Sequence, residues 1–421
     1  MTAHPPDRGR QFRSGRPASD RWSRIVAAPF HRLLDRIDAG LEHGAIEAWL
    51  PDGSYRILGG RGQGPVAEVD MRHWRALIRL ARSGSVGWYQ AWASGDWASP
   101  DPVPLFDLFM RNGRTLGRSA RASGISRRLK KLAHWLRANT LRGAKRNIAF
   151  HYDLGNDFYA EWLDETMTYS SALFQEPIRA DEELAYAQLN KVRALLDRLE
   201  LKPDQHLLEI GCGWGTLADI AADEYGANVT ALTLSQEQRE HALELNRCNV
   251  QAGRVSIELK DYREVSGQYD AVASVEMVEA VGQRWWPAYL QAIARALKPG
   301  GWAAIQYIAI DDDLFDAYAS SADFIQTYIF PGGMLISESR FRAAAAEAGL
   351  EWSDQRNFGL HYAETLKRWR ERFEQAAALG QLPAGFDRRF VDLWRYYLMY
   401  CEGGFRGGGI WVAQATLIKR G

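Results

Sequence analysis

The chain has 421 residues and equal numbers of basic and acidic side chains, so its formal net charge is zero and no whole-protein field favours nucleic acid. This length exceeds that of a usual single domain and predicts two domains. The 46% of hydrophobic residues suits well-packed soluble cores.

The cysteines and the hydropathy exclude further classes of protein. Cys212, Cys248 and Cys401 are too few and too scattered for a disulfide framework or a zinc site. Cys212 lies in a glycine-rich loop where oxidation would be harmful, so a reducing cytoplasm is predicted. No stretch approaches the roughly 20 apolar residues that span a bilayer, so any membrane contact is predicted to be peripheral.

The N-terminal residues predict a tail and then a small α+β domain. Residues 1–24 are rich in Arg, Pro and Ser without an apolar run, which indicates a disordered basic tail and not a signal peptide. Within a domain predicted over residues 25–112, apolar side chains at helical spacing indicate helices around Leu34 and Leu77.

A hairpin and an aromatic run complete this domain. Alternating segments at Ala45–Leu50 and Tyr55–Leu58 flank Pro51-Asp52-Gly53, which is a turn signal. The aromatic run Trp88–Trp97 is predicted to pack in the core, with a lipid-contacting surface as the alternative.

A strongly basic segment follows. Between Leu108 and Tyr152 there are twelve Lys or Arg residues and no Asp or Glu. Such a block suits an anionic surface, either phospholipid headgroups or nucleic acid, and the alternative is a solvated linker helix. A basic linker is therefore predicted over residues 113–146. The chain contains no known nucleic-acid-binding motif, so nucleic acid is the less favoured of these partners.

Residues 147–421 alternate between strands and helices. This alternation predicts an α/β domain with a mainly parallel sheet and helices on both faces. The final segment is predicted to be a closing, antiparallel strand at Gly409–Lys419. The predicted strands are Leu207–Ile210, Asn228–Leu232, Val255–Leu259, Tyr269–Val275 and Gly301–Ile308, and the predicted helices are Asp181–Leu201, Gln236–Gln251 and Trp286–Leu297.

A glycine-rich turn follows the first of these strands. The segment 206–215 is an apolar strand that ends in Glu209 and continues as Gly211, Gly213 and Gly215 before a helix. Glycine allows a sharp turn and lets a ligand lie against bare backbone at a helix N-terminus. The spacing differs from the dinucleotide fingerprint Gly-x-Gly-x-x-Gly. It is similar to the nucleotide-binding loop of class I S-adenosylmethionine (SAM) methyltransferases, and the alternative is a plain strand–helix turn.

Further motifs narrow the resemblance. The second strand ends in Thr233-Leu234-Ser235 with Gln238 after it, where most class I methyltransferases carry a carboxylate. This pattern resembles the cyclopropane-fatty-acid synthases, which comprise bacterial phospholipid enzymes and mycolic acid enzymes. The other segments that resemble this family are His151–Phe158, Met167–Ser171, Lys260–Arg263, Tyr328–Gly333 and Asn357–Gly359 with Tyr362.

The resemblance implies a fold and a cofactor. The fold is the Rossmann-like class I methyltransferase fold with a mainly parallel seven-stranded sheet, and the cofactor is SAM. Tyr169 and Ser170 would contact its methionine part, and Thr233, Leu234 and Gln238 would hold the ribose and nearby atoms. The other residues implied at the cofactor are Glu209, Gly211, Gly213 and Gly215 in the glycine loop, and Asp261 and Tyr262 beside the adenine.

The resemblance also implies a bound bicarbonate as the catalytic base. Glu279 stands at the position of the family's bicarbonate-binding glutamate, Tyr362 at that of its tyrosine and Ile308 at that of its backbone group. Ser171 stands where the family has cysteine, and Gln306 where it has histidine. Both can still hydrogen-bond an anion, but Gln306 cannot become cationic or shuttle a proton.

Glu276 lies three residues before Glu279, so the two carboxylates would share one face of a helix. Paired acid–base carboxylates are one interpretation. The simpler one makes Glu279 the site residue and Glu276 a cofactor-side or solvent residue. No ligand spacing predicts a metal.

These observations predict a SAM-dependent methyltransferase acting on the double bond of unsaturated acyl chains of phospholipids. The N-terminal lipid-binding domain and the linker would hold it peripherally at the inner face of the cytoplasmic membrane, and relatives suggest a homodimer. A carbocation would form and close to a cyclopropane. A methyl-branched or methylated olefinic chain is the alternative that Ser171 and Gln306 leave open. The rivals are a methyltransferase for a small soluble acceptor and a decayed lipid-binding protein.

Overall fold

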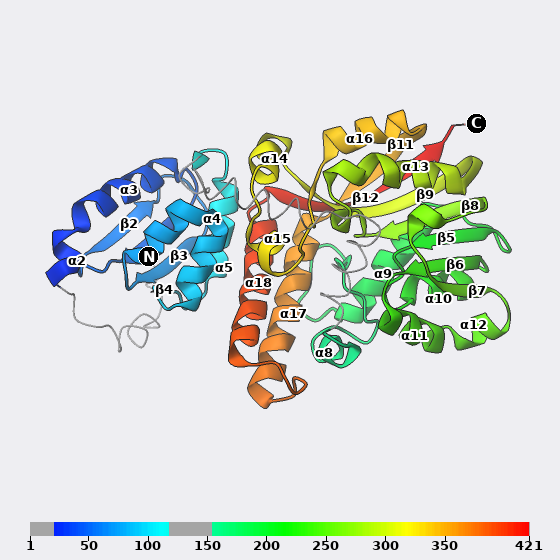
Figure 1. The fold of residues 1–421 in the computed structure, drawn as a ribbon, viewed down its shortest axis with the longest axis horizontal. Coiled ribbons are helices and arrows are strands. Elements are labelled where there is room, and N and C mark those ends of the chain that lie inside the picture. Colours follow the sequence, from blue (N-terminus) through cyan, green and yellow to red (C-terminus); the bar gives the residue numbers. More distant parts are fainter. Residues whose placement is uncertain (1–20, 118–153, 421) are drawn as a thin grey trace. The chain divides into compact units, whose positions relative to one another are not determined.

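The computed structural model describes residues 21–117 and 154–420, which belong to two compact units (Figure 1). The boundary between the units, at residues 128 and 129, lies outside the described residues, as do most of the predicted tail and of the predicted basic linker. Arg21–Ile25 form a short helix, α2, where the tail was predicted to end.

The N-terminal unit is a four-stranded mixed sheet with helices. The strand order is β2-β1-β3-β4, and β1 is antiparallel to β2 and parallel to β3. The predicted hairpin is confirmed, since β1 and β2 pair antiparallel across a turn in which Gly53 adopts a φ of 91°. After α2 the elements are α3 (Ala27–Gly40), β1 (Ala45–Trp49), β2 (Tyr55–Gly59), β3 (Val66–Met71), α4 (Arg75–Ala93), β4 (Trp97–Ala98) and α5 (Val103–Arg111).

The aromatic run of this unit lies in its core. Trp88 and Trp97 are buried, and their rings stack with centroids 4.5 Å apart. The Trp97 indole N–H donates to the Trp88 carbonyl at 3.0 Å. Core packing, the first of the two predicted roles, is therefore confirmed for these two side chains.

The second unit is built on a largely parallel sheet. Seven strands follow the order β11-β12-β9-β8-β5-β6-β7, and the two-residue strand β10 pairs with β9 as an eighth. In chain order, the first elements of this unit are α8 (Asn156–Ala160), α9 (Leu184–Asp197), β5 (His206–Ile210), α10 (Thr216–Asp223), β6 (Asn228–Thr233), α11 (Gln236–Leu245), α12 (Arg247–Gln251), β7 (Val255–Leu259) and β8 (Tyr269–Val275). After β8 come α13 (Trp286–Ala296), β9 (Leu297–Ile310), α14 (Asp312–Ala319), α15 (Phe324–Tyr328), β10 (Ile336–Ser337), α16 (Glu338–Glu347), β11 (Leu350–Asn357), α17 (Gly359–Leu379), α18 (Arg388–Arg406) and β12 (Ile410–Lys419).

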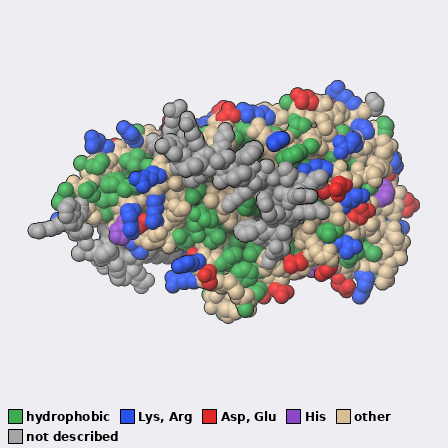
Figure 2. Space-filling view, viewed as in Figure 1, with side chains coloured by type: hydrophobic (Ala, Val, Ile, Leu, Met, Phe, Trp, Pro, Cys, Tyr) green, Lys and Arg blue, Asp and Glu red, His purple; other side chains and the backbone are tan. Residues whose placement is uncertain are grey.

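The predicted strands are confirmed, and β12 is antiparallel to β9 as expected. Helices α9, α10 and α11 cover one face of this sheet and α13 and α16 the other (Figure 1). One predicted helix is broken, because Asn246 separates α11 from α12. Basic and acidic side chains are interspersed over the face of this unit seen in Figure 2.

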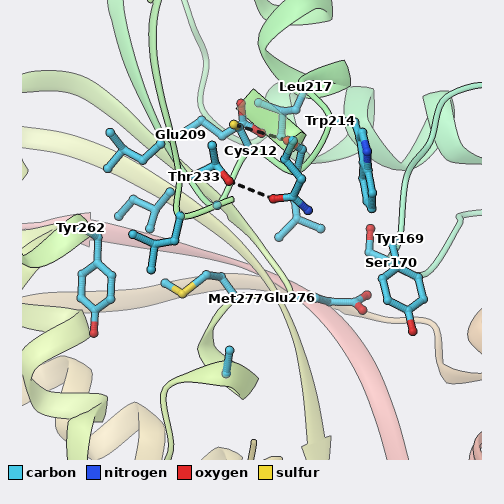
Figure 3. A pocket seen from close by; sticks show the side chains of 18 of the residues that line it. Tyr169, Ser170, Glu209, Cys212, Trp214, Leu217, Thr233, Tyr262, Glu276 and Met277 are labelled. Carbon is cyan, nitrogen blue, oxygen red and sulfur yellow. Dashed lines mark hydrogen bonds between the residues drawn. The ribbon is translucent and has the colours of Figure 1, made fainter. Parts of the chain in front are cut away.

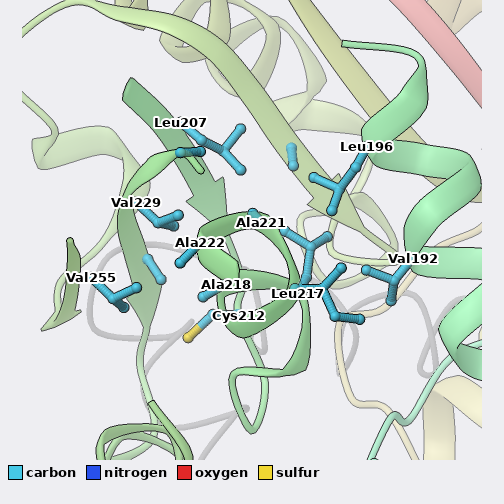
Figure 4. Close-up of a cluster of buried hydrophobic side chains, with 14 of the residues drawn as sticks. Val192, Leu196, Leu207, Cys212, Leu217, Ala218, Ala221, Ala222, Val229 and Val255 are labelled. Atoms are coloured by element: carbon cyan, nitrogen blue, oxygen red, sulfur yellow. The ribbon is translucent and has the colours of Figure 1, made fainter. Parts of the chain in front are cut away.

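A cluster of small and branched side chains joins the sheet to its helices. Leu207, Val229 and Val255, from three neighbouring strands, face α10 and α9 in Figure 4. The alanines of α10 let this helix approach the sheet closely, and Leu196 of α9 closes the cluster with no exposed surface. The cluster thereby fixes β5 and the start of α10, between which the glycine loop runs.

We expect Leu196→Ala to lower the free energy of unfolding of this unit by about 2–5 kcal/mol, because it leaves a cavity in a closely packed cluster. Leu245→Ala is the matched control, since Leu245 is 44% exposed and its truncation leaves no cavity. Urea unfolding followed by tryptophan fluorescence measures both. Equal midpoints for the two variants would contradict the packing.

Candidate active site

A cavity lies at the carboxyl ends of the parallel strands of the second unit. Strand β5 has β6 on one side and β8 on the other, so chain order reverses here, which is where open α/β sheets bind ligands. Tyr262 lies at one end of this cavity, and Tyr169 and Ser170 lie at the other (Figure 3). Of the residues predicted at the cofactor, those that line the cavity are Tyr169, Ser170, Glu209, Gly211, Gly213, Thr233, Leu234, Gln238, Asp261 and Tyr262.

Gly215 is the predicted cofactor residue that does not line the cavity. It caps α10 with a φ of 96°, and a Cβ there would lie 2.8 Å from the Ala242 side chain. The Asn246 amide donates to the Gly215 carbonyl at 3.2 Å. Gly215 is therefore needed for close packing of α10 against α11, whereas Gly211 and Gly213 form the floor of the cavity.

The segment after β6 forms a polar wall. The Thr233 hydroxyl donates to the Gln238 side-chain carbonyl at 2.9 Å (Figure 3), and the Ser235 hydroxyl accepts from the Gln238 backbone N–H. This pairing directs the Gln238 amide NH₂ away from Thr233 and leaves it free to donate to a ligand oxygen. Asp261 is buried and forms an ion pair with Arg263 at 2.7 Å, which holds the adjoining Tyr262 segment.

Lys191 is a buried residue of the cavity that sequence reasoning missed. Its ammonium donates to the Ser170 hydroxyl at 2.6 Å, and its side chain is 1% exposed. Burial lowers the pKa of Lys191 to about 8, against the opposing charges of Glu276, Asp164 and Glu209. The sequence contained a signal for the burial of Lys191, because this residue falls at helical spacing on the apolar stripe that contains Leu184 and Leu195.

Glu209 places a second buried charge at the floor of the cavity. It is 3% exposed, and its Oε2 has no hydrogen-bond partner among the described residues. Burial raises the pKa of Glu209 to about 8, and the Lys191 charge opposes this rise. An unpartnered buried carboxyl oxygen is suited to a ligand that brings a positive charge or donors.

Glu276 forms the centre of a cluster at the Tyr169 end of the cavity. Its Oε1 accepts from the Ser171 backbone N–H at 2.9 Å and from the Gln306 amide at 2.8 Å. Its Oε2 accepts from the Tyr362 hydroxyl at 2.8 Å. Burial raises the pKa of Glu276, and these donors and Lys191 lower it. The structure thus brings Ser171, Gln306 and Tyr362, three of the residues implied to hold bicarbonate, together on Glu276, while Glu279 accepts from Ile308.

Glu279 and Ile308 form a separate pair beside this cluster. The Ile308 N–H donates to Glu279 Oε1, and Glu279 Oε2 is buried without a partner among the described residues. Burial, and then the adjoining charge of Glu276, raise the pKa of Glu279 to about 8. The two carboxylates do not share a helix face, because Glu276 has a φ of 48° and only Val278–Ala280 form a short 3-10 helix.

Within residues 21–117 and 154–420, no group of three or more His, Cys, Asp or Glu side chains could hold a metal ion. None of the helices in these two ranges has the length and apolarity to cross a membrane.

Comparisons with known proteins identify the relatives of this chain. The family model described as mycolic acid cyclopropane synthetase matches residues 139–415. The tuberculostearic acid methyltransferase UfaA1 of Mycobacterium tuberculosis is 40% identical over 359 residues, which cover 82% of this chain and 81% of that protein. The cyclopropane-fatty-acyl-phospholipid synthase of Escherichia coli is 32% identical over 362 residues, covering 84% of this chain and 88% of that protein.

A solved structure adds the ligand class. The crystal structure of mycolic acid cyclopropane synthase CmaA1 complexed with SAH and CTAB is 30% identical, with a TM-score of 0.60. It covers 65% of this chain and 98% of that chain. SAH is what remains of SAM after methyl transfer, so the predicted fold and cofactor are confirmed, and Glu209, Gln238 and the bare glycine floor fit that cofactor.

The charges of the cavity predict a pH-dependent affinity for SAM. The sulfonium cation favours ionised Glu209 and neutral Lys191, whose pKa values are both about 8. Protons must leave these groups when SAM binds at lower pH, so its affinity should rise about 3- to 10-fold from roughly pH 7 to 9. SAH lacks the sulfonium charge and should change less. Calorimetric titration of both ligands tests this, and equal pH dependence would contradict it.

The control for this experiment is Glu209→Gln. This variant removes one of the two titrating groups and keeps the shape of the side chain. We expect it to weaken SAM binding more than SAH binding and to flatten the pH dependence that is specific to SAM.

Proposed function

The chain belongs to the mycolic acid cyclopropane synthetase family, and we propose that it transfers the methyl group of SAM to the double bond of an unsaturated acyl chain in a membrane phospholipid. The observation that carries this proposal is the carboxylate cluster on Glu276 at the methionine end of the SAM cavity, beside a wall of aromatic rings. Bound SAM supplies a sulfonium methyl group that the π electrons of an alkene can attack.

The ring of Tyr169, which lines the cavity and packs against other buried rings, suits the charge that such a reaction creates. The Tyr169 ring lies 5.4 Å from the rings of both Trp162 and Trp369 and 5.5 Å from that of Tyr159, between centroids. Its hydroxyl is within 2.7 Å of the Tyr397 hydroxyl. Rings of this kind exclude water and tolerate a positive charge on the acyl chain through their π faces.

The identity of the methyl acceptor is inferred from the names of two relatives and from the basic block of this chain. The two curated relatives above, which match more than 80% of this chain, are named for tuberculostearic acid methylation and for fatty-acyl-phospholipid cyclopropanation. The basic block between Leu108 and Tyr152 lies largely outside the described residues and supplies the positive charge that an anionic leaflet attracts. We place the protein peripherally at the inner face of the cytoplasmic membrane, with residues 25–112 and 113–146 as its lipid-binding parts.

Two products remain candidates. Loss of a proton from the transferred methyl group closes a cyclopropane, which was the first prediction. Loss from a neighbouring chain carbon gives a methylated olefin, and the 40% identical relative is named as a methyltransferase. The replacement of the family cysteine and histidine by Ser171 and Gln306 also leaves this second product open.

The product test uses purified protein, SAM and vesicles of oleoyl phosphatidylglycerol. We expect acyl chains heavier by one CH₂, and fragmentation that locates a ring or a branch separates the two products. Activity should require the vesicles. Turnover of a water-soluble acceptor without lipid would instead support a methyltransferase for a small soluble acceptor. A protein that binds no SAM would support a decayed lipid-binding protein. Absence of heavier chains, with SAM bound, would contradict the phospholipid assignment.

A further inference from the structure

The Glu276 carboxylate occupies the centre of the predicted anion site. The resemblance implies that Ser171, Gln306 and Tyr362 surround a bound bicarbonate. In the structure, donors from these three residues go to the two oxygens of Glu276, at 2.8–2.9 Å. These donors come from three segments far apart in the sequence and converge on one side chain.

The direction of these hydrogen bonds shows that Glu276 accepts. Arg198 can only donate, and it reaches the Gln414 side-chain oxygen at 3.4 Å. The Gln414 amide then donates to the Gln306 oxygen at 3.0 Å, which turns the Gln306 NH₂ group towards Glu276. The Ser171 backbone N–H is likewise an obligate donor. Oε1 therefore receives two fixed donors, which favour the ionised carboxylate.

The other oxygen, Oε2, remains able to take a proton. It receives one hydrogen bond, from Tyr362. A carboxylate oxygen has two lone-pair sites, so one stays open. Figure 3 shows the carboxylate pointing towards Tyr169 and Ser170, at the end of the cavity where the methionine part of SAM is expected.

The backbone supports a functional role for this position. Glu276 has a φ of 48°, a left-handed conformation that side chains other than glycine rarely adopt. Its own N–H donates to the Gln306 carbonyl at 2.8 Å, which holds the conformation. Such strain persists where the surrounding structure enforces it, and it is concentrated at active sites.

We propose that Glu276 is the proton acceptor of the reaction and replaces bicarbonate in this protein; this rests on the proposed function. A bicarbonate beside Glu276 would compete for donors already in use and would repel the carboxylate. The alkene electrons form the C–C bond to the methyl carbon while the C–S bond breaks, so the sulfur leaves neutral and the acyl chain carries the positive charge. Glu276 then accepts a proton either from the transferred methyl group or from a chain carbon next to this charge. The electron pair of that C–H bond closes the ring or forms a double bond, and Glu276 later returns the proton to water.

The first test compares bicarbonate-free buffer with buffer containing added bicarbonate. We expect the wild-type rate of lipid product formation to change less than about 2-fold, because the acceptor is part of the chain. Glu276→Gln keeps the shape and can satisfy the same neighbours, and should lower this rate about 100-fold or more. Glu347→Gln removes an exposed carboxylate in α16 and should leave the rate unchanged.

The second test uses Glu276→Gly. Glycine accepts the left-handed backbone without strain, and the loss of the side chain frees the three donors for an anion. We expect this variant to bind SAM, to be inactive in bicarbonate-free buffer and to regain activity when bicarbonate or formate is added. SAM titration and thermal unfolding establish that it is folded.

The outcomes separate the two proposals. A wild-type protein that makes methylated lipid only with bicarbonate overturns the assignment of Glu276 and leaves the proposed function intact. Glu276→Gln with full activity overturns the assignment in the same way, and so does Glu276→Gly that binds SAM and gains nothing from added anions. A wild-type protein that never methylates lipid, with or without bicarbonate, overturns the proposed function itself.

Discussion

The site depends on carboxylates that are held in a place that water scarcely reaches. Burial favours their neutral form, and it raises the pKa values of Glu209 and Glu279 to about 8. Burial raises the pKa of Glu276 as well, but its hydrogen-bond donors and Lys191 oppose that rise. Two obligate donors meet one oxygen, Tyr362 meets the other, and the buried Lys191 charge lies nearby. Fixed donors cost no reorganisation during a reaction, so a base held in this way is ready before the substrate arrives.

The parallel sheet is what allows these groups to meet. Glu209 lies next to the last residue of β5, Glu276 follows β8 and Gln306 lies in β9. Neighbouring strands therefore bring these residues to one region although they are far apart in sequence. β12 then contributes Gln414 directly opposite Gln306 in the antiparallel register. That pairing orients the Gln306 amide. The closing strand therefore acts on the site through a hydrogen bond as well as through packing.

The strands that the sequence predicted, β12 included, are present in this sheet, but no helix or strand was predicted between β9 and β12. β7 and β8 have the predicted bounds, because buried parallel strands are short apolar runs with clear ends. Strand β11, with its mostly exposed polar residues, gave no such run. The long helices α17 and α18 were not predicted, although buried side chains recur along both at helical spacing. The motif residues were predicted from the resemblance, and all the predicted cofactor residues except Gly215 line the cavity. Glu276 was predicted to be a cofactor-side or solvent residue, and it lines the cavity, but the helical spacing assumed for it is wrong because its backbone is left-handed.

The two departures from the family pattern, Ser171 and Gln306, have a common explanation in the position of Glu276. Ser171 contributes its backbone N–H, while its hydroxyl donates to the Ala172 carbonyl at 3.0 Å, so its side chain does not hold the anion. Gln306 needs only to donate, and a neutral amide fixed by Gln414 does this without a charge. A cationic imidazole at that position would stabilise the carboxylate further and weaken it as a base. With the acceptor built into the chain, a neutral donor therefore preserves its basicity, and neither replacement requires that catalysis be lost.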